Sequence, residues 1–425
     1  MNKFKLFLFF TFLIVPLYGF ENHKIDGYMM FQDILTGNEN GLEATSGSLI
    51  GLKLEYSGEI DKDLKGFINF YSYEPVEFLM DREKRLPKSY FANREAGGES
   101  TLGEIYLIYQ RGNYSFSTGR KSIKYGSEKY RDINNYSFVP NIFELYGLKY
   151  KGVNGVFNMN HLTKISLGTS SMPNYGLIGE HTASAGTVVH ITKKNEYLNI
   201  GEIAGLDKKT SGITMLAYST DIDRVNLELI NYYAYGISNI LYIESSLKYK
   251  FGSLKMRYSF QLLNQIGVGD TNPIDNLSAT MLGAKIKVKY KKLTSSIALN
   301  RSYGDTFFNF FGLDPAFTSS IFSKNSYRKD VTAYKVMLLY NLNKNWKTLI
   351  THSNYGQSKT VNIKGWSPID DATETDIALI YKPTKNFTIK LLKILRVSEY
   401  NGVIVKGDKN DRTMDTFRLG VGYKF

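Results

Sequence analysis

The heptapeptide AKIKVKY, residues 284–290, carries four apolar side chains that alternate with three lysines. In a helix the lysines would spread around the circumference, whereas in a β-strand, whose side chains point alternately to opposite faces, all three lie on one face. The segment is therefore predicted to be a strand with one apolar and one basic face. The same period of two recurs in SLIGLKLEY (residues 48–56) and SLKMRYSFQL (residues 253–262).

Segments with this alternation follow one another along the chain and are separated by turns. The predicted strands lie near residues 24–35, 46–59, 64–75, 100–111, 113–124, 143–153, 156–169, 210–220, 224–236, 240–251, 253–264, 277–291, 293–303, 331–342, 346–356, 373–382, 386–399 and 412–425. They number about eighteen, an even count as in bacterial outer-membrane barrels. Sixteen and twenty strands are the alternatives, because residues 170–209 can either fold at the rim or add another hairpin.

The connections between these strands alternate in length. One set is short, such as the tripeptides RGN and FGS, whereas the other reaches about 25 residues at 76–99 and 304–330 and about 40 at 170–209. Short turns at one rim and long loops at the other are typical of an outer-membrane barrel, with turns in the periplasm and loops outside. The sequence therefore predicts an all-β fold, a transmembrane antiparallel β-barrel of about 18 strands in the bacterial outer membrane.

The first and last strands are predicted to close this barrel. In lipid every backbone N–H and C=O needs a partner within the protein, so a sheet is stable there only if it closes. The last strand, RLGVGYKF (residues 418–425), should therefore pair with KIDGYMMFQDIL (residues 24–35). Its outward apolar side chains end in Phe425, and a terminal Phe on an alternating strand resembles the signal read by the outer-membrane insertion machinery.

The N-terminal stretch has the features of a secretory signal peptide. Two lysines precede an apolar run that is too short for a spanning helix, and the small Gly19 marks the predicted cleavage site. Residues 1–19 are thus predicted to be a signal peptide and residues 20–425 a single transmembrane β-barrel domain. The 425 residues include no Cys, which excludes disulfides and thiolate chemistry, and 32 Tyr, a residue that suits the lipid interface.

The alternation also predicts which charges face the barrel interior. A Lys or Arg on the lipid-facing side would cost about 2–4 kcal/mol at the membrane midplane, so the basic side chains are assigned to the inside. The predicted pore-lining basic residues are Lys53, Lys121, Lys149, Lys151, Lys255, Arg257, Lys285, Lys287, Lys289 and Arg418. Rows of fixed positive charge attract anions and the carboxylate end of a zwitterion. For lysines near strand ends, contact with lipid headgroups or lipopolysaccharide phosphates is the alternative.

A barrel of eighteen strands is too wide for its own side chains to fill. A water-filled channel for small hydrophilic solutes is therefore the expected function. Two loops are predicted to narrow it, YGSEKYRDINNYSFVPNIFE (residues 125–144) and the strongly apolar GDTFFNFFGLDPAFTSSIF (residues 304–322). Their candidate constriction residues are Glu128, Arg131, Asp132, Glu144, Asp305 and Asp314. For both loops the alternative is packing at the outer rim.

The stretch TGRKSIKYGSEKYRDINNYSFVPNIFELYGLKYKGV, residues 118–153, resembles porins of the OprD family, the outer-membrane carboxylate channels. Family members carry Gly-Arg followed by Gln or Lys before the third loop, and Pro-x-x-Phe-Glu-Gly before the next strand. The matching positions are Gly119, Arg120, Lys121, Pro140, Phe143 and Glu144. The chain departs from the pattern at Leu145, where the family usually has Gly. Family members also have an Asp-Arg pair between the two motifs, and here its order is inverted as Arg131-Asp132.

This resemblance implies more than the residues alone predict. It implies an eighteen-stranded channel that inward loops narrow and in which a basic ladder guides small carboxylate-bearing solutes such as amino acids. A resemblance to porins of Campylobacter-like, epsilonproteobacterial organisms is a close variant of the same interpretation. The departures at Leu145 and Arg131-Asp132 bear on the choice of solute.

Other function classes have less support in the sequence. An enzyme is not expected, because the chain has only five His, each without a recognisable partner, and no Gly-x-Ser-x-Gly elbow. The His residues are His23, His161, His181, His190 and His352. An adhesin or structural barrel with binding loops is the alternative function. GDKNDRTMD, with Asp408, Asn410 and Asp411, could hold calcium in an outer loop, although its spacing is not that of an EF-hand.

The expected partners follow from the predicted barrel. They are small hydrophilic solutes, lipid and lipopolysaccharide, and the insertion machinery through Phe425, whereas no cofactor and no resident metal are predicted. Nucleic acid is not expected, because the net charge of +13 is divided among alternating strands and does not gather on one exposed face. The chain is predicted to be a monomer or a homotrimer.

Overall fold

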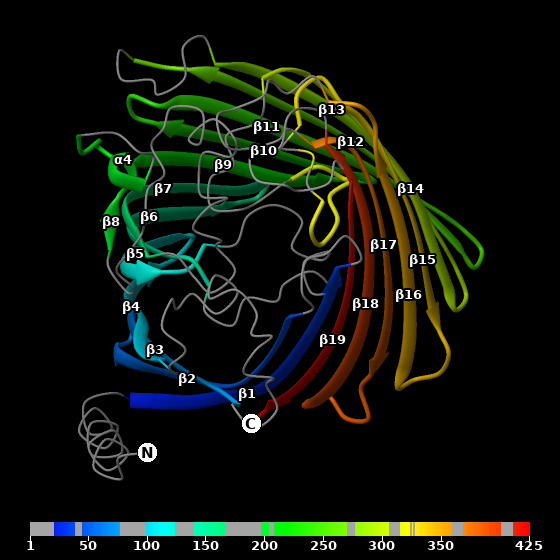
Figure 1. Cartoon of the computed structure of the whole chain (residues 1–425). Coiled ribbons are helices and arrows are strands. Elements are labelled where there is room, and N and C mark those ends of the chain that lie inside the picture. Colours follow the sequence, from blue (N-terminus) through cyan, green and yellow to red (C-terminus); the bar gives the residue numbers. More distant parts are fainter. Residues whose placement is uncertain are drawn as a thin grey trace.

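The computed structural model describes most of the chain, and most of what it describes is β-strand (Figure 1). The described residues are 21–38, 45–76, 99–123, 140–166, 197–203, 208–269, 277–305, 315–323, 325, 328–358, 369–400 and 411–425. The predicted signal peptide lies outside them. Among the described residues, no helix is long and apolar enough to cross a membrane.

The strands appear in simple chain order around the molecule. Their bounds are β1 (Glu21–Asn38), β2 (Thr45–Asp61), β3 (Leu64–Pro75), β4 (Glu99–Arg111), β5 (Tyr114–Lys121), β6 (Ile142–Gly152), β7 (Gly155–Ser166), β8 (Leu198–Asn199), β9 (Ile213–Ile222), β10 (Val225–Ala234), β11 (Ser238–Phe251), β12 (Leu254–Gly267), β13 (Ser278–Tyr290), β14 (Leu293–Gly304), β15 (Thr332–Asn341), β16 (Trp346–Tyr355), β17 (Ile369–Tyr381), β18 (Phe387–Tyr400) and β19 (Asp411–Lys424), and the short helix α4 spans Ile200–Ile203. Each of the eighteen predicted strands overlaps one of the long strands.

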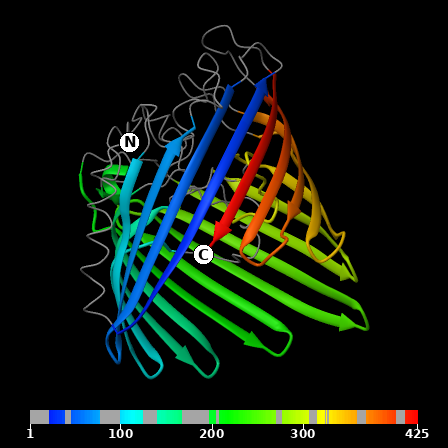
Figure 2. The same ribbon diagram turned by 90° about the horizontal axis from the view of Figure 1, so that it is seen from below.

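The long strands form one closed antiparallel sheet. Each pairs with the next in sequence, and β1 pairs with both β2 and β19, so the prediction of an eighteen-stranded barrel is confirmed (Figures 1 and 2). The wall passes directly from β7 to β9, with Leu162 opposite Ile213. The two-residue β8 only extends the edge of β7, so no described residue between Ser166 and Ile213 forms a hairpin in the wall.

The closing strand pair is the one that the sequence predicted. Its register runs from Tyr28 opposite Lys424 to Asn38 opposite Met414. Beyond it, the Gly27 N–H donates to the Phe425 carbonyl at 2.8 Å, and the Phe425 N–H donates to the Gly27 carbonyl at 3.0 Å. The backbone of the final residue is thus part of the closed sheet.

The two faces of the sheet differ as the alternation predicts. On the outer face, large apolar side chains are open to the surroundings, for example Phe260 at 60%, Ile286 at 45% and Ile297 at 63% of their maximal accessible area. The neighbours of Ile286 along β13, Lys285 and Lys287, point to the other face because the strand is regular there. An apolar outer surface on a closed sheet is the arrangement that a lipid bilayer requires.

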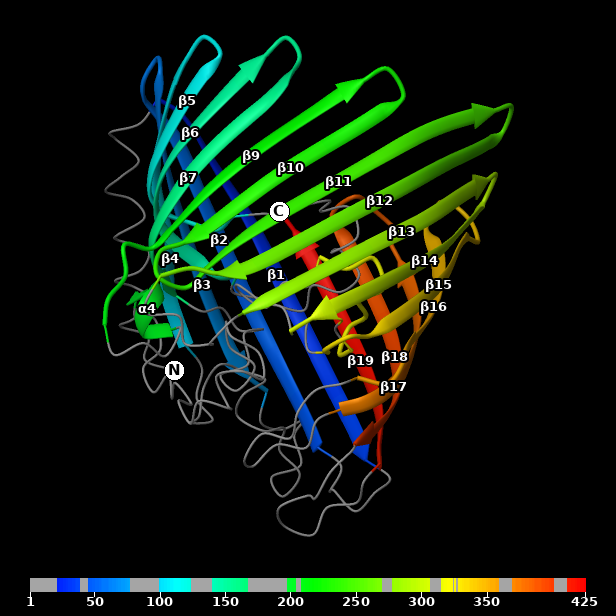
Figure 3. The same cartoon turned by 90° about the horizontal axis from the view of Figure 1, so that it is seen from above.

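The two ends of the barrel also differ. Short turns join the strands at the end where β1 begins and β19 ends, and Figure 3 shows these hairpins projecting side by side. The turn residues are 62–63, 112–113, 153–154, 223–224, 252–253, 291–292, 342–345 and 382–386. Gly112 and Gly252 adopt left-handed conformations with φ of 55° and 56°, which a tight two-residue hairpin turn requires. The remaining connections leave the strands at the opposite end.

Candidate functional site

The segment of residues 315–323, hereafter the inner segment, lies inside the barrel. Figure 1 shows it, in yellow, inside the ring of strands; along the chain it lies between β14 and β15. Ala316 belongs to an apolar cluster that includes Leu263 and Met281 of the wall. Ile321 and Phe322 pack against a second apolar cluster of the wall, around Leu349, Leu392 and Ile394. The sequence predicted that residues 304–322 fold inward, and residues 315–322, the part of this loop beyond β14 that the structure describes, do lie inside the barrel.

Neutral polar side chains of the wall fasten the first half of the inner segment. Gln261 of β12 accepts the Phe317 N–H at 2.9 Å and donates to the Pro315 carbonyl at 3.0 Å. Asn300 of β14 accepts the Thr318 N–H at 3.0 Å. Because these groups are buried, the hydrogen bonds satisfy backbone atoms that would otherwise be costly to enclose.

A carboxylate fastens the second half. Glu374 of β17, which is fully buried, accepts the backbone N–H groups of Phe322 at 2.9 Å and Ser323 at 2.6 Å, one on each oxygen. The Tyr355 hydroxyl lies 2.6 Å from the Thr318 carbonyl oxygen and 2.9 Å from that of Ser323. Hydrogen bonds to a charged acceptor are the stronger kind, so this end of the segment is firmly held.

Two basic side chains of the wall lie beneath aromatic rings of the inner segment. The Lys285 ammonium is 3.8 Å from the centre of the Phe317 ring, and the Arg418 guanidinium is 4.9 Å from that of Phe322. Only 8% of Lys285 and 5% of Arg418 is exposed. Lys335 of β15 donates to the Ser319 carbonyl at 2.6 Å. These three cations therefore face the interior, but the segment covers them.

The basic residues of this wall, including Lys285 and Lys335, form rows that cross neighbouring strands. We call the inward cations of β11 to β15 the basic panel; its members are Lys248, Lys250, Lys255, Arg257, Lys285, Lys287, Lys289 and Lys335. In the register, Lys250 stands opposite Lys255 and Lys255 opposite Lys289. In the next row Lys248 stands opposite Arg257, and Arg257 opposite Lys287. Like charges placed directly opposite one another destabilise a sheet, so packing alone does not account for the panel.

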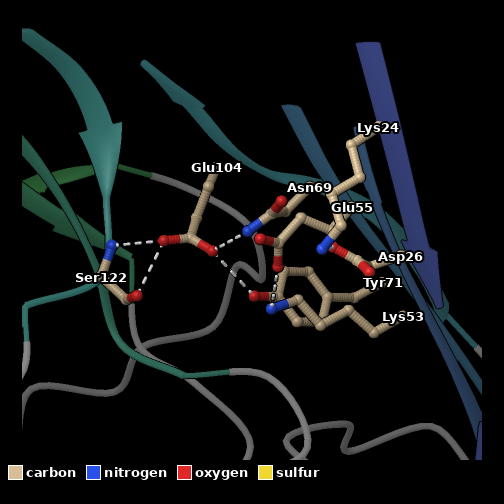
Figure 4. A network of polar contacts seen from close by, with 8 residues as sticks. All are labelled: Lys24, Asp26, Lys53, Glu55, Asn69, Tyr71, Glu104 and Ser122. Atoms are coloured by element: carbon tan, nitrogen blue, oxygen red, sulfur yellow. Dashed lines mark hydrogen bonds and ion pairs between the residues drawn. The ribbon is translucent and has the colours of Figure 1, made fainter. Parts of the chain in front are cut away.

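The opposite wall carries a network in which acids balance the bases (Figure 4). Lys53 of β2 pairs with Glu55 at 2.9 Å, and its ammonium lies 5.6 Å from the centre of the Tyr71 ring. Glu104 of β4 accepts hydrogen bonds from the Tyr71 hydroxyl at 3.0 Å, from the Asn69 amide, and from the Ser122 N–H and hydroxyl at 2.8 and 2.7 Å. Glu104 is buried and ties β3 and β4 to Ser122, the residue that follows β5.

The remaining predicted pore-lining residues, Lys121, Lys149 and Lys151, lie on β5 and β6. The Lys121 ammonium is 5.0 Å from the centre of the Tyr106 ring. Lys149 and Lys151 alternate on β6 with the exposed Tyr146 and Tyr150, so they point to the inner face.

Of the predicted constriction residues, two lie in the described part of the chain. Glu144 is in β6, 3.6 Å from the Lys164 ammonium, so it belongs to a strand and not to a loop. Asp305 follows β14 and pairs with Lys329 at 2.9 Å. Glu128, Arg131, Asp132 and Asp314 fall outside the described residues, as do Asp408 and Asn410 of the candidate calcium site. No group of three or more metal-binding side chains occurs among the residues that the structure describes.

Sequence reasoning missed the residues that hold the inner segment. Gln261, Asn300 and Tyr355 are uncharged, so a search for charged side chains passes over them. The parity of SFQL does place Gln261 on the inward face, and a large buried amide there is the one signal that could have marked it.

Comparison with known proteins identifies the fold. No protein-family model and no curated protein sequence matches the chain. Among solved structures, a BenF-like porin from Pseudomonas fluorescens Pf-5 is similar with a TM-score of 0.74 at 10% identity, covering 96% of this chain and 100% of that chain. OpdK from Pseudomonas aeruginosa, solved with vanillate, gives 0.70 at 10% identity, with the same coverage. OccK2 from Pseudomonas aeruginosa, in complex with glucuronate, gives 0.70 at 9% identity, covering 96% of this chain and 99% of that chain.

The motif at residues 118–153 resembles the OprD family, and the fold of the chain is similar to these porin structures. The similarity extends over nearly the whole chain, and the closed sheet, its strand order and its apolar outer face are those of a bacterial outer-membrane barrel. The chain therefore has the fold of the OprD/Occ outer-membrane porins.

Proposed function

We propose that this protein is a bacterial outer-membrane porin through which small hydrophilic solutes diffuse, with a preference for anions and carboxylate-bearing solutes. The observation that carries the proposal is the basic panel on the inner face of a closed barrel. Fixed positive charge inside a low-dielectric wall raises the local concentration of anions and lowers that of cations.

The structural neighbours support the same kind of solute. They are porins, which are channels and not enzymes, and two of them were solved with vanillate and with glucuronate. Both of those molecules carry a carboxylate. In this chain the cations that we propose to attract such carboxylates are the exposed members of the basic panel together with Lys53, Lys121, Lys149 and Lys151.

The inner segment narrows the proposed passage. It lies across the inner face from β12 to β19 and is fastened by buried hydrogen bonds, so its position is fixed relative to the wall. Solute must pass on the side of the segment that faces away from the wall. The covered cations Lys285 and Arg418 then act on solutes through their field, and the open cations act by direct contact.

The remaining parts of the proposal concern location and assembly. Residues 1–19 are proposed to be removed on export, leaving residues 20–425 as one barrel in contact with lipid and lipopolysaccharide. N-terminal sequencing of the protein from outer membranes tests the cleavage site. Native mass spectrometry in detergent distinguishes a monomer from a homotrimer.

Single-channel recording in a planar bilayer tests the function. The purified barrel is expected to give stepwise currents, and a salt gradient of potassium chloride is expected to give a reversal potential of the sign that chloride permeation sets. A folded barrel that inserts but passes no ions would contradict the proposal and would favour the adhesin alternative. A folded barrel that passes cations in preference to chloride would contradict the anion preference alone.

A further inference from the structure

The eight short turns that the structure describes at one end of the barrel differ in charge. Three of them contain five lysines and no acid, and these are the turns of residues 291–292 (KK), 342–345 (LNKN) and 382–386 (KPTKN). The other five turns contain two basic and two acidic residues between them. We call the lysines of the three basic turns the lysine strip, and they are Lys291, Lys292, Lys344, Lys382 and Lys385. All five are exposed.

The three basic turns lie side by side and contact one another. The Lys292 ammonium donates to the Leu342 carbonyl at 3.1 Å, and the Asn341 N–H donates to the Lys292 carbonyl at 3.0 Å. The Lys382 N–H donates to the Asn345 carbonyl at 2.8 Å. The five lysines therefore lie along one continuous part of the rim, where their combined field attracts anions.

Aromatic side chains set the depth of the lysine strip in the membrane. Tyr290, Trp346 and Tyr381 lie at the turn ends of β13, β16 and β17, each four residues from an exposed isoleucine of the outer face. The rings of Trp346 and Tyr381 stack with their centres 4.3 Å apart. Tyrosine and tryptophan on the outside of a barrel occupy the level of the lipid headgroups. Lys291 and Lys382 directly follow the two tyrosines, so the strip lies at headgroup depth.

We propose that the lysine strip binds the headgroups of anionic phospholipids, such as phosphatidylglycerol, in the periplasmic leaflet of the outer membrane. Such a lipid carries a net negative charge on its phosphodiester, with which ammonium groups at the same depth can pair. The turns are short, so they hold the lysines in the headgroup layer, and this favours lipid over a partner that lies further into the periplasm. The proposal goes beyond the porin function and does not rest on it, because lipid contacts the outside of the barrel whether or not solute passes through it.

Native mass spectrometry of the detergent-solubilised barrel tests the preference. The wild type is titrated with phosphatidylglycerol and, separately, with phosphatidylcholine of the same acyl chains, and the bound lipids are counted. We expect half-saturation with phosphatidylglycerol at a concentration at least tenfold lower than with phosphatidylcholine. Each lysine near an anionic lipid surface raises the affinity roughly fivefold, so the strip variant, Lys344→Gln/Lys382→Gln/Lys385→Gln, should remove this difference.

The variant Lys62→Gln/Arg111→Gln/Arg224→Gln is the matched control. It removes the same number of positive charges from exposed positions at the same rim but outside the lysine strip, so it should keep the lipid preference of the wild type. Heat-modified migration of unboiled and boiled samples in gel electrophoresis shows whether each variant is a folded barrel. Equal binding of the two lipids to the wild type, an unchanged preference in the strip variant, or an equal loss of preference in both variants would overturn the proposal.

Fluorescence quenching of Trp346 locates the bound lipid. Trp366→Phe leaves Trp346, two residues from Lys344, as the single tryptophan of the chain. In vesicles, phosphatidylglycerol with brominated acyl chains should quench its fluorescence more than the same fraction of brominated phosphatidylcholine, and the strip variant should abolish this difference. Equal quenching by the two lipids around the otherwise wild-type barrel would contradict the proposed location.

The cell wall is the competing partner on the periplasmic side. Sedimentation of the detergent-solubilised barrel with isolated peptidoglycan tests it. Sedimentation of the wild type but not of the strip variant, together with equal binding of the two lipids, would assign the strip to the cell wall and overturn the lipid site. All these measurements need a folded barrel and no current, so they remain decisive if the barrel passes no ions.

Discussion

The ring of Phe425 lies directly over Gly27, so closely that a Cβ atom on Gly27 would overlap it. The two residues also exchange backbone hydrogen bonds at 2.8 and 3.0 Å. The last residue of the chain thus completes the closing strand pair with both its backbone and its side chain.

Gly27→Ala should weaken this closure. The added methyl group displaces the Phe425 ring, at a cost of about 0.5–1.5 kcal/mol if the ring leaves its preferred rotamer. We expect a thermal unfolding midpoint a few degrees lower and a smaller yield of folded barrel. Gly37→Ala, on the same strand, is the control, because its nearest neighbour would be the Asp415 carbonyl oxygen at 3.8 Å. Identical melting of the two variants would show that the ring does not depend on Gly27.

Lys287→Gln and Lys285→Gln should affect ion selectivity unequally. Lys287 is half-buried on the inner face, whereas only 8% of Lys285 is exposed beneath the Phe317 ring. Reversal potentials in a salt gradient are expected to shift towards cations more for Lys287→Gln than for Lys285→Gln. The opposite order would mean that the Phe317 ring does not shield Lys285 from permeating ions.

Glu374→Ala should release one end of the inner segment. The change leaves the partly buried Phe322 N–H and the buried Ser323 N–H without their acceptor, and a buried unsatisfied N–H costs about 1–3 kcal/mol. We expect a lower unfolding midpoint together with larger open-channel current noise. Glu374→Gln keeps one acceptor oxygen and should lie between the wild type and Glu374→Ala. A quiet, unchanged channel in Glu374→Ala would show that the other contacts suffice to hold the segment.

Glu104→Ala should destabilise the opposite wall without changing the inner segment. The carboxylate accepts four hydrogen bonds, from Asn69, Tyr71 and the backbone and hydroxyl of Ser122. Loss of a buried acceptor that serves several donors should lower the free energy of unfolding by about 2–4 kcal/mol. Urea unfolding followed by tryptophan fluorescence measures this. Asp223→Asn, in an exposed short turn, should unfold like the wild type.

The anion preference should decrease as the salt concentration rises. Open cations at the short-turn end act through water, in which the screening length falls from about 10 Å at 0.1 M to about 3 Å at 1 M. We expect the permeability ratio of chloride to potassium to be closer to one at the higher concentration. A ratio that does not depend on salt would place the selectivity at buried cations and not at the exposed Lys250, Lys255 and Lys289.

The alternation of side chains was enough to predict the wall of this barrel. In AKIKVKY and RLGVGYKF the period of two gives both the strand and its faces, because lipid on one side and water on the other impose opposite requirements on neighbouring residues. The closing pair followed from the need to satisfy every backbone group. The strand ends differ by a few residues, as at β5, which ends at Lys121, three residues before the predicted end.

The inside of the barrel was less predictable. The position of Lys285 in the alternating strand predicts that it faces inward. It does not predict the Phe317 ring that covers Lys285, because that contact joins a strand to a distant loop. Likewise Gln261 and Asn300 carry no charge and no periodic signal that ties them to residues 315–323. The pore-lining role of the basic residues and the narrower resemblance to porins of Campylobacter-like bacteria stay predictions.

The fastened inner segment also has a mechanical consequence. A cylinder made of one sheet resists stretching along its hydrogen bonds but flattens easily into an ellipse, which would change the bore. Hydrogen bonds from Gln261, Asn300 and Glu374 attach their strands to the inner segment, and contacts from Tyr355 and Arg418 attach two more strands to it. Flattening would have to break these bonds together, so this side of the cylinder should keep its curvature under lateral pressure from the bilayer.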